Sequence, residues 1–182
     1  MAAPLTVLVP VTGTVVDVGD VDDPVFSAGL VGPGLAVEPD DAQGGEAVAP
    51  ITGTVVKLHP HAFVVQHDDG RAVLVHLGIN TVQLGGEGFT THVAQGDHVQ
   101  RGTVLVTWDP KAVRAGGRSA VCPVVALEAA PDDVTSLTEV GAWAAHGEEL
   151  LTWGCRRRAA RAAVRAVSRA AGAGGAGGGG GP

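Results

Sequence analysis

The chain has 182 residues, enough for one well-packed core, and 45% of them are hydrophobic although only 3% are aromatic. All 19 acidic residues but only six basic ones lie in residues 1–155, and this surplus of acid argues against nucleic-acid binding. No apolar run approaches the roughly 20 residues of a membrane-spanning helix, and the start of the chain lacks the basic region of a signal peptide, so we expect a cytoplasmic protein that does not itself span the membrane.

Short Val-rich runs recur between Gly, Pro and Asp clusters along residues 1–155, a pattern typical of an antiparallel sandwich or barrel. In chain order the expected strands are TVLVPV (6–11), GTVVDV (13–18), GLAVEP (34–39), GTVVKL (53–58), AFVVQH (62–67), AVLVHLG (72–78), GTVLVTW (102–108), CPVVALE (122–128) and ELLTW (149–153). Short helical turns are expected at 81–84, 110–115 and 132–138. The predicted fold class is all-β: a compact antiparallel β-sandwich, or barrel-sandwich hybrid, with short helical turns.

Residues 156–182 differ in composition from the rest. They hold six Arg and no acidic residue, and they end in a Gly run that cannot form a packed core. We therefore predict one domain over 1–155 and a disordered tail over 156–182. A solvated appendage is the simpler interpretation of this tail, and contact with anionic lipid or nucleic acid is the alternative.

An internal repeat lies within the predicted strands. Val9–Val18, with the sequence VPVTGTVVDV, returns 40 residues later as Ala49–Leu58, APITGTVVKL. The shared core of Pro, an apolar residue and TGTVV predicts two copies of one hairpin unit, packed with pseudo-symmetry.

A predicted hairpin at PHAFVVQHDDGRAVLVHLG, residues 60–78, carries a histidine near each end. Asp68-Asp69-Gly70 is a turn signal, because Gly supplies the positive φ that tight turns need. His61 lies eight residues before Asp69 and His76 seven after it, so the two should meet across the ladder, directly opposite or one step diagonal. His76 neighbours Gly78 on its face, which we expect to leave room for another molecule.

Two facing histidines without an acid suit two kinds of chemistry. One imidazole could accept a phosphoryl group while the other donates a hydrogen bond to the phosphoryl oxygens. Alternatively His59 and His61 form an HxH pair that, with His76, could bind zinc as in an open hydrolytic site. The residues alone leave both open. A lipoyl- or biotinyl-type carrier is disfavoured because neither lysine of the chain lies in a suitable tight hairpin.

Four motifs decide between these alternatives by resemblance. They are DVDDPVFSAGLVGPGLAVEP (Asp20–Pro39), PHAF (Pro60–Phe63), VHLGINTVQLGGEGF (Val75–Phe89) and CPVVALE (Cys122–Glu128). From Leu8 to about Trp153 the chain resembles the enzyme IIA (EIIA) domain of the glucose/N-acetylglucosamine branch of the bacterial sugar phosphotransferase system (PTS). That resemblance implies a largely antiparallel β-sandwich.

The resemblance also implies roles and partners. His76 would be the phosphoryl acceptor and His61 the supporting histidine of a phosphotransferase component without a cofactor. Phosphate would come from the phosphocarrier HPr and pass to a cysteine of a IIB domain, which we expect, with the membrane-embedded IIC, on separate chains. Regulatory targets are further candidate partners. No tightly bound metal is implied, although His61 and His76 could share a zinc ion with such a partner.

A shallow apolar surface around the histidines would dock these partners. The positions that match the family's surface are Asp23, Val25, Phe26, Leu30, Val31, Phe63, Gly78, Asn80 and Val82. Two positions depart from the family: Asn80 stands where an Asp is frequent, and His59 where a Thr commonly orients the supporting histidine. We expect His59 to be exposed, with an orienting hydrogen bond to His61 as the alternative. Cys122 should be a small buried hydrophobe.

Overall fold

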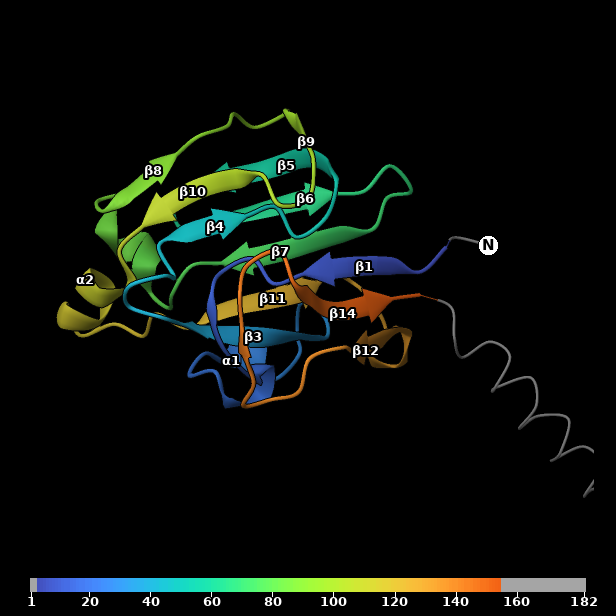
Figure 1. Ribbon diagram of the computed structural model, residues 1–182, viewed down its shortest axis with the longest axis horizontal. Coiled ribbons are helices and arrows are strands. Elements are labelled where there is room, and N and C mark those ends of the chain that lie inside the picture. Colours follow the sequence, from blue (N-terminus) through green and yellow to red (C-terminus); the bar gives the residue numbers. More distant parts are fainter. Residues whose placement is uncertain (1–2, 155–182) are drawn as a thin grey trace, which may run out of the picture.

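The computed structural model describes residues 3–154, and there the chain is built from short strands (Figure 1). The strands are β1 Leu5–Leu8, β2 Gly13–Asp17, β3 Gly34–Pro39, β4 Glu46–Val48, β5 Gly53–His59, β6 Ala62–Gln66, β7 Ala72–His76, β8 Phe89–Thr91, β9 His98–Val99, β10 Val104–Trp108, β11 Cys122–Ala126, β12 Val134–Ser136, β13 Trp143–Ala144 and β14 Glu149–Trp153. The helices are α1 Pro24–Ser27 and α2 Pro110–Ala115, with 3₁₀ turns η1 Val18–Asp20, η2 Thr81–Leu84 and η3 Pro131–Asp133. The predicted tail over 156–182 lies outside the described residues.

The described strands form three antiparallel sheets. The large one has the order β13-β2-β3-β11-β7-β6-β5-β9, and two three-stranded sheets have the orders β4-β10-β8 and β1-β14-β12. In Figure 1 the β4-β10-β8 sheet lies across the β5–β6 part of the large sheet, and α1 lies on the other side of β3. The all-β sandwich is thus confirmed.

Two layers of apolar side chains hold the sheets together. The main core covers the inner face of the large sheet, and it includes the completely buried residues Val37 and Val75 of that sheet and Leu105 of β10. A smaller cluster covers part of the outer face, where Phe26 of α1 packs with Ala36 and Val125. Successive residues of a strand thus pack into different apolar layers, because side chains of a strand point to alternate faces of the sheet. α1 is held on the outer face by this second layer.

The internal repeat is confirmed as pseudo-symmetry. The N–H of Leu8 donates to the carbonyl of Pro50 at 2.8 Å, and the N–H of Val48 donates to the carbonyl of Pro10 at 2.9 Å. The two bonds are related by the 40-residue shift between the copies. Beyond them β2 pairs with the short strand β13, and β5 pairs with the short strand β9. The two copies therefore bond to each other reciprocally.

Two of the three expected helical turns are confirmed, as η2 and α2. The expected turn at 132–138 is wrong for most of its length, because Val134–Ser136 pairs with β14 as strand β12. The helix α1 was not expected, although its signal is local: the carboxylate of Asp23 accepts a hydrogen bond from the N–H of Val25, and Pro24 occupies the first helical position.

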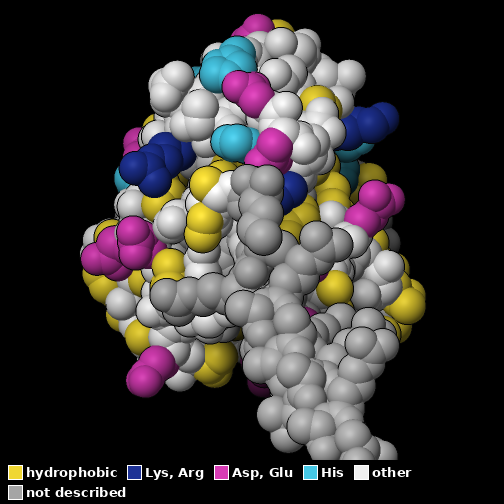
Figure 2. Space-filling model, turned by 90° about the vertical axis from the view of Figure 1, so that its right-hand side faces the viewer, with side chains coloured by type: hydrophobic (Ala, Val, Ile, Leu, Met, Phe, Trp, Pro, Cys, Tyr) yellow, Lys and Arg dark blue, Asp and Glu magenta, His cyan; other side chains and the backbone are white. Residues whose placement is uncertain are grey.

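Charged side chains are dispersed over one face of the molecule. On the face shown in Figure 2, acidic side chains are spread among apolar and neutral ones instead of forming one patch. Some are paired, as in the contact of 2.5 Å between Nη2 of Arg114 and Oε1 of Glu38. Within residues 3–154, no helix has the length and apolar character needed to span a membrane.

Arg71 joins the hairpin turn between β6 and β7 to both ends of the described chain. Its guanidinium donates to the carbonyl of Trp153 at 2.6 Å and to the carbonyl of Ala3 at 2.8 Å, and it also donates to the carboxylate of Asp69. Trp153 and Ala3 are 82 and 68 residues away from Arg71 in the sequence. The arginine also holds the pKa of the Asp69 carboxyl well below its usual range.

We expect Arg71→Met to lower the free energy of unfolding by about 2 kcal/mol, because hydrogen bonds from a charged donor are each worth roughly 1.5–3 kcal/mol. Methionine retains the apolar stem but cannot donate. Denaturant unfolding measures the change, with Arg101→Met as the control, since Arg101 is exposed and its side chain has no such contacts. Equal stability of the two variants would show that the Arg71 contacts contribute nothing.

Candidate active site

Three residues of neighbouring strands share the outer face of the large sheet at one end of the β5–β6–β7 hairpins. The register pairs His59 with Ala62 and Ala62 with His76. Directly paired residues point to the same face, so the two histidines flank an alanine methyl group. The next row, Leu58, Phe63 and Val75, points the other way into the core.

A β-bulge in β5 turns His59 toward that face. Val55 pairs with Val65 and Lys57 with Val64, which leaves Val56 as the extra residue. Val55 is completely buried, and strict alternation from it would turn His59 toward the core as well. The extra residue reverses the alternation.

His61 reaches the site from the two-residue turn between β5 and β6. The sequence prediction placed it on the ladder, but Ala62 is the residue opposite His76. A turn residue is not bound to strand alternation, so the His61 ring can lie over the small Ala62. Its centroid is 5.2 Å from that of His76 in an edge-to-face arrangement. The two histidines meet as expected, although His61 does so from a turn.

One hydrogen bond determines the chemical state of His76. Its Nδ1 lies 2.5 Å from the carbonyl oxygen of Gly78. A carbonyl can only accept, so Nδ1 carries the proton, and in the neutral ring Nε2 holds the free lone pair. His76 is therefore oriented and left with one nucleophilic nitrogen.

Burial favours the neutral form of both imidazoles. It is the main cause of a lowered pKa at His76, opposed by the Gly78 carbonyl and by the negative charge of Asp23. The pKa of His61 is lowered first by burial, then by repulsion from His76 and from His59. A neutral ring keeps the lone pair that a nucleophile requires.

We expect both ring titrations to have midpoints below 6.5, the ordinary value for histidine. Between the lowered pKa and 6.5 the unfolded state binds more protons, so the free energy of unfolding decreases as the pH falls through this window and recovers above it. NMR titration of the ring protons checks the midpoints, and thermal unfolding at several pH values checks the stability. A His76 midpoint at or above 6.5 would contradict the role given to burial.

The expectation that Gly78 leaves room for another molecule is wrong. Its positive φ of 76° turns its Cα inward, where an added Cβ would lie 2.7 Å from Cγ2 of Thr81 and 2.9 Å from the carbonyl oxygen of Ser119. Gly78 is buried and leaves no room for a ligand or a partner there. Its contribution to the site is its carbonyl group.

Sequence patterns did not predict two supports of the site. Thr81 is completely buried, and its hydroxyl donates to the carbonyl of Leu77 at 2.7 Å, which closes the turn that carries Gly78. The bulge at Val56 is the other. A single Thr in a polar stretch does not predict a hydrogen bond that closes a turn. A bulge at Val56 could not be predicted either, because Val56 is the same residue type as its neighbour Val55.

Comparison with known proteins identifies the family. A model of the phosphoenolpyruvate-dependent sugar phosphotransferase system, EIIA 1, matches residues 5–131. The chain belongs to this EIIA family. The match includes both histidines and the Gly78 turn, so the geometry described above is that of a family member.

Individual relatives agree. A glucose-specific EIIA component of Halalkalibacterium halodurans is 42% identical over 118 residues, which cover 64% of this chain and 66% of the relative. A glucose-specific EIIBCA component of Corynebacterium glutamicum is 40% identical over 122 residues, 66% of this chain but only 18% of the relative. The solved glucose permease IIA from Mycoplasma capricolum superimposes with a TM-score of 0.74 at 31% identity, covering 83% of this chain and 96% of that one. The chain thus spans about two thirds of the first relative and a small part of the second.

The surface around the EIIA histidines is partly as expected. Val25, Leu30 and Val82 are exposed apolar residues, with 44%, 72% and 60% of their surface accessible. Asn80 is exposed, whereas Asp23 and Val31 are half-buried. Phe26 is buried, and its ring lies 5.5 Å from that of His76. The expectation that Phe63 belongs to the docking surface is wrong. Phe63 pairs with Val75 on the core face and is 0% exposed, so it cannot contact a partner.

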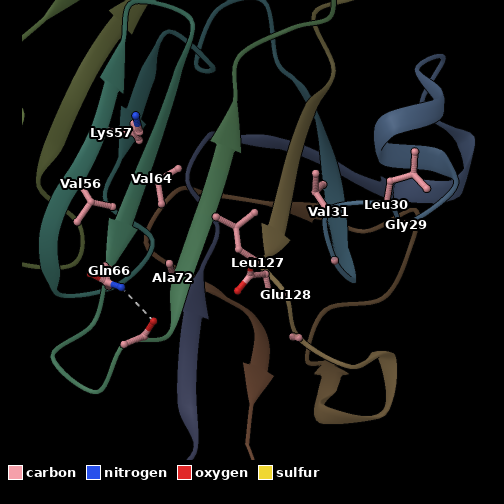
Figure 3. Close-up of a pocket in the computed structure, with 13 residues that line it drawn as sticks. Gly29, Leu30, Val31, Val56, Lys57, Val64, Gln66, Ala72, Leu127 and Glu128 are labelled. Carbon is pink, nitrogen blue, oxygen red and sulfur yellow. Dashed lines mark hydrogen bonds between the residues drawn. The ribbon is translucent and has the colours of Figure 1, made fainter.

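A groove of 610 Å³, lined by both apolar and polar residues, lies farther along the outer face of the same strands (Figure 3). Val64 and Ala72 form its floor on β6 and β7, and Leu30 and Val31 lie on the α1 side. Ala72 and His76 are on one face of β7, four residues apart. The groove therefore lies on the same face of β7 as His76, and its lining is of mixed polarity.

His59 is exposed, as expected, and its ring stacks on that of His61 with centroids 5.6 Å apart. In the described chain it makes no hydrogen bond to His61. Residues 3–154 also hold no group of three or more His, Cys, Asp or Glu side chains placed to bind a metal ion. The geometry therefore gives the zinc alternative no support. Cys122 is a buried small residue as predicted, and burial raises the pKa of its thiol to about 12.

Proposed function

We propose that this chain is a cytoplasmic phosphocarrier of the sugar phosphotransferase system. His76 accepts a phosphoryl group from phospho-HPr and passes it to a cysteine of a IIB domain. The observation that carries this proposal is the hydrogen bond from Nδ1 of His76 to the Gly78 carbonyl, which leaves Nε2 as the nucleophile.

The first transfer moves the phosphoryl group from phospho-HPr to His76. The lone pair of Nε2 attacks phosphorus, and the bond between phosphorus and the donor atom of HPr breaks with its electron pair returning to that atom. The phosphorylated His76 ring becomes cationic, and the Gly78 carbonyl stabilises the charge at Nδ1–H. In the second transfer a cysteine thiolate attacks the same phosphorus, and Nε2 regains its lone pair.

His61 is the hydrogen-bond donor to the phosphoryl oxygens. Its ring lies beside that of His76, so an N–H of His61 can donate to an oxygen of the phosphoryl group on Nε2. The charge on the oxygens changes during transfer, and a fixed donor stabilises the transition state without reorganisation. The role of His61 is thus electrostatic positioning.

The relatives support the partners we propose. The names of several include EIIB and EIIC together with EIIA in one component, among them the mannose-specific EIIBCA of Corynebacterium glutamicum and the beta-glucoside-specific EIIBCA of Bacillus subtilis. We assign IIB and IIC as the downstream partners on this basis. HPr as donor rests on the resemblance of the histidine motifs.

Partners should dock on the exposed apolar residues near His76. We expect Val82→Asp and Leu30→Asp each to raise KM for the IIB acceptor roughly tenfold, because a charge introduced into an interface hot spot costs about 1–2 kcal/mol. Steady-state transfer kinetics measure this. Val140→Asp is the matched control, since Val140 is 55% exposed and is not among the positions matched to the family's docking surface. If all three variants behave alike, the docking surface is assigned wrongly.

Phosphorylation in a defined system tests the function. The protein is incubated with phosphoenolpyruvate, enzyme I and HPr, and its intact mass is then determined. We expect one added phosphoryl group, lost on acid treatment, and absent when HPr is omitted. Well-folded protein that gains no label would overturn the proposal.

A further inference from the structure

Four rings form an unbroken row across the site. Phe26 contacts His76 edge-on with centroids 5.5 Å apart, His76 contacts His61 in the same way at 5.2 Å, and His61 stacks on His59 at 5.6 Å with 20° between their planes. All three distances lie in the range of favourable aromatic pairs, about 4.5–7 Å. The row begins at the buried α1 side and ends at His59.

The two ends of the row differ in support. Phe26 is fixed by the outer apolar cluster and holds His76 from one side. His61 stands on a turn next to Ala62 and has no side-chain hydrogen bond within residues 3–154. The His59 ring stacks on the His61 ring, and this contact restricts how the His61 ring can rotate.

We propose that His59 is a positioning residue of the phosphoryl-transfer site, which stacks on His61 and holds its ring toward His76. This inference rests on the proposed function and adds a third histidine to it. His59 touches neither phosphate nor the reacting nitrogen. It acts through the orientation of His61, which must place an N–H within hydrogen-bond reach of the phosphoryl oxygens.

The backbone is built to present His59 in this place. Only the bulge at Val56 turns His59 outward, and the pairing of His59 with Ala62 sets it next to the turn that carries His61. Pro60 stands between the two histidines and fixes its own φ, so the offset between their rings is restrained. An exposed histidine of no use to the site would not depend on this geometry.

Kinetics of two substitutions test the stack. His59→Ala should lower kcat for transfer from phosphorylated His76 to the IIB cysteine roughly tenfold, since a misplaced catalytic group is costly, and leave KM for IIB within about twofold. His59→Phe keeps a flat ring without charge or donor, and should restore kcat to within about threefold of the wild type. His98→Ala, an exposed histidine on β9, is the control and should not change either constant.

NMR of the unphosphorylated protein supplies a readout that needs no transfer activity. In the wild type and in His59→Phe we expect cross-relaxation between the ring protons of His61 and His76, and in His59→Ala a weaker signal. If the wild type accepts no phosphate, the proposed function fails, and the NMR comparison still decides this inference. An unchanged kcat in His59→Ala, an effect on KM alone, or a Phe variant as slow as the Ala variant would each overturn it.

Discussion

His76→Gln should abolish phosphoryl acceptance. Glutamine has a similar reach and can still donate to the Gly78 carbonyl, so the loop 76–81 keeps its conformation. It lacks the ring nitrogen whose lone pair attacks phosphorus, and no other nucleophile lies in its place. After incubation with phosphoenolpyruvate, enzyme I and HPr, intact mass spectrometry should therefore detect no added phosphoryl group.

The control is His92→Gln. His92 is exposed, and within residues 3–154 its side chain has one hydrogen bond, to the hydroxyl of Thr107, so the loss of the imidazole should leave labelling complete. Thermal unfolding of both variants would show that the effect at His76 is chemical. A label on folded His76→Gln protein would mean that the acceptor is another residue, and peptide mapping would find it.

His61→Ala should separate acceptance from transfer. The variant still has the Nε2 nucleophile of His76, so it should become phosphorylated, although more slowly. Passing the group to the IIB cysteine should be roughly 10²–10³-fold slower, the typical cost of removing one donor that stabilises charge in a transition state. Single-turnover transfer from the isolated phosphoprotein measures this step.

His61→Gln refines the test. An amide N–H can donate to a phosphoryl oxygen but cannot become cationic, so its transfer rate should lie between those of wild type and His61→Ala. Because His61 lies in a turn at the surface, neither change should affect the core. Transfer at the wild-type rate in His61→Ala would remove His61 from the mechanism.

The two expectations differ because the histidines are held differently. The His76 ring has a backbone hydrogen bond on Nδ1 and a buried aromatic ring beside it. The His61 ring has ring contacts to His76 and to His59, and within residues 3–154 its side chain has no hydrogen bond. The nucleophile is thus rigidly placed, whereas the donor depends on its neighbours.

The strands and the histidine pair were predictable from local patterns. Alternation such as AVLVH reflects the period of two that places Val73 and Val75 in the core and Leu74 and His76 outside. The repeat of Pro and TGTVV predicted pseudo-symmetry, and the motif around VHLGIN predicted the family. These signals are contained within short segments or their copies.

Other features required the tertiary structure. The bulge at Val56 has no distinguishing residue, because it arises from how β5 is matched to β6. The packing of Gly78 against Ser119, and of β12 against β14, joins segments far apart in sequence. These features are stabilised by contacts that exist only once the sheets are assembled.

For this protein the sequence by itself determined the all-β class and the two repeat units, and it predicted that His61 and His76 meet, because periodicity and motifs are local properties. Only the tertiary structure decided which nitrogen of His76 is free, that His61 approaches from a turn, that Phe63 lies in the core and that His59 completes the ring row. Those outcomes depend on register, and register is settled by the packing of whole strands.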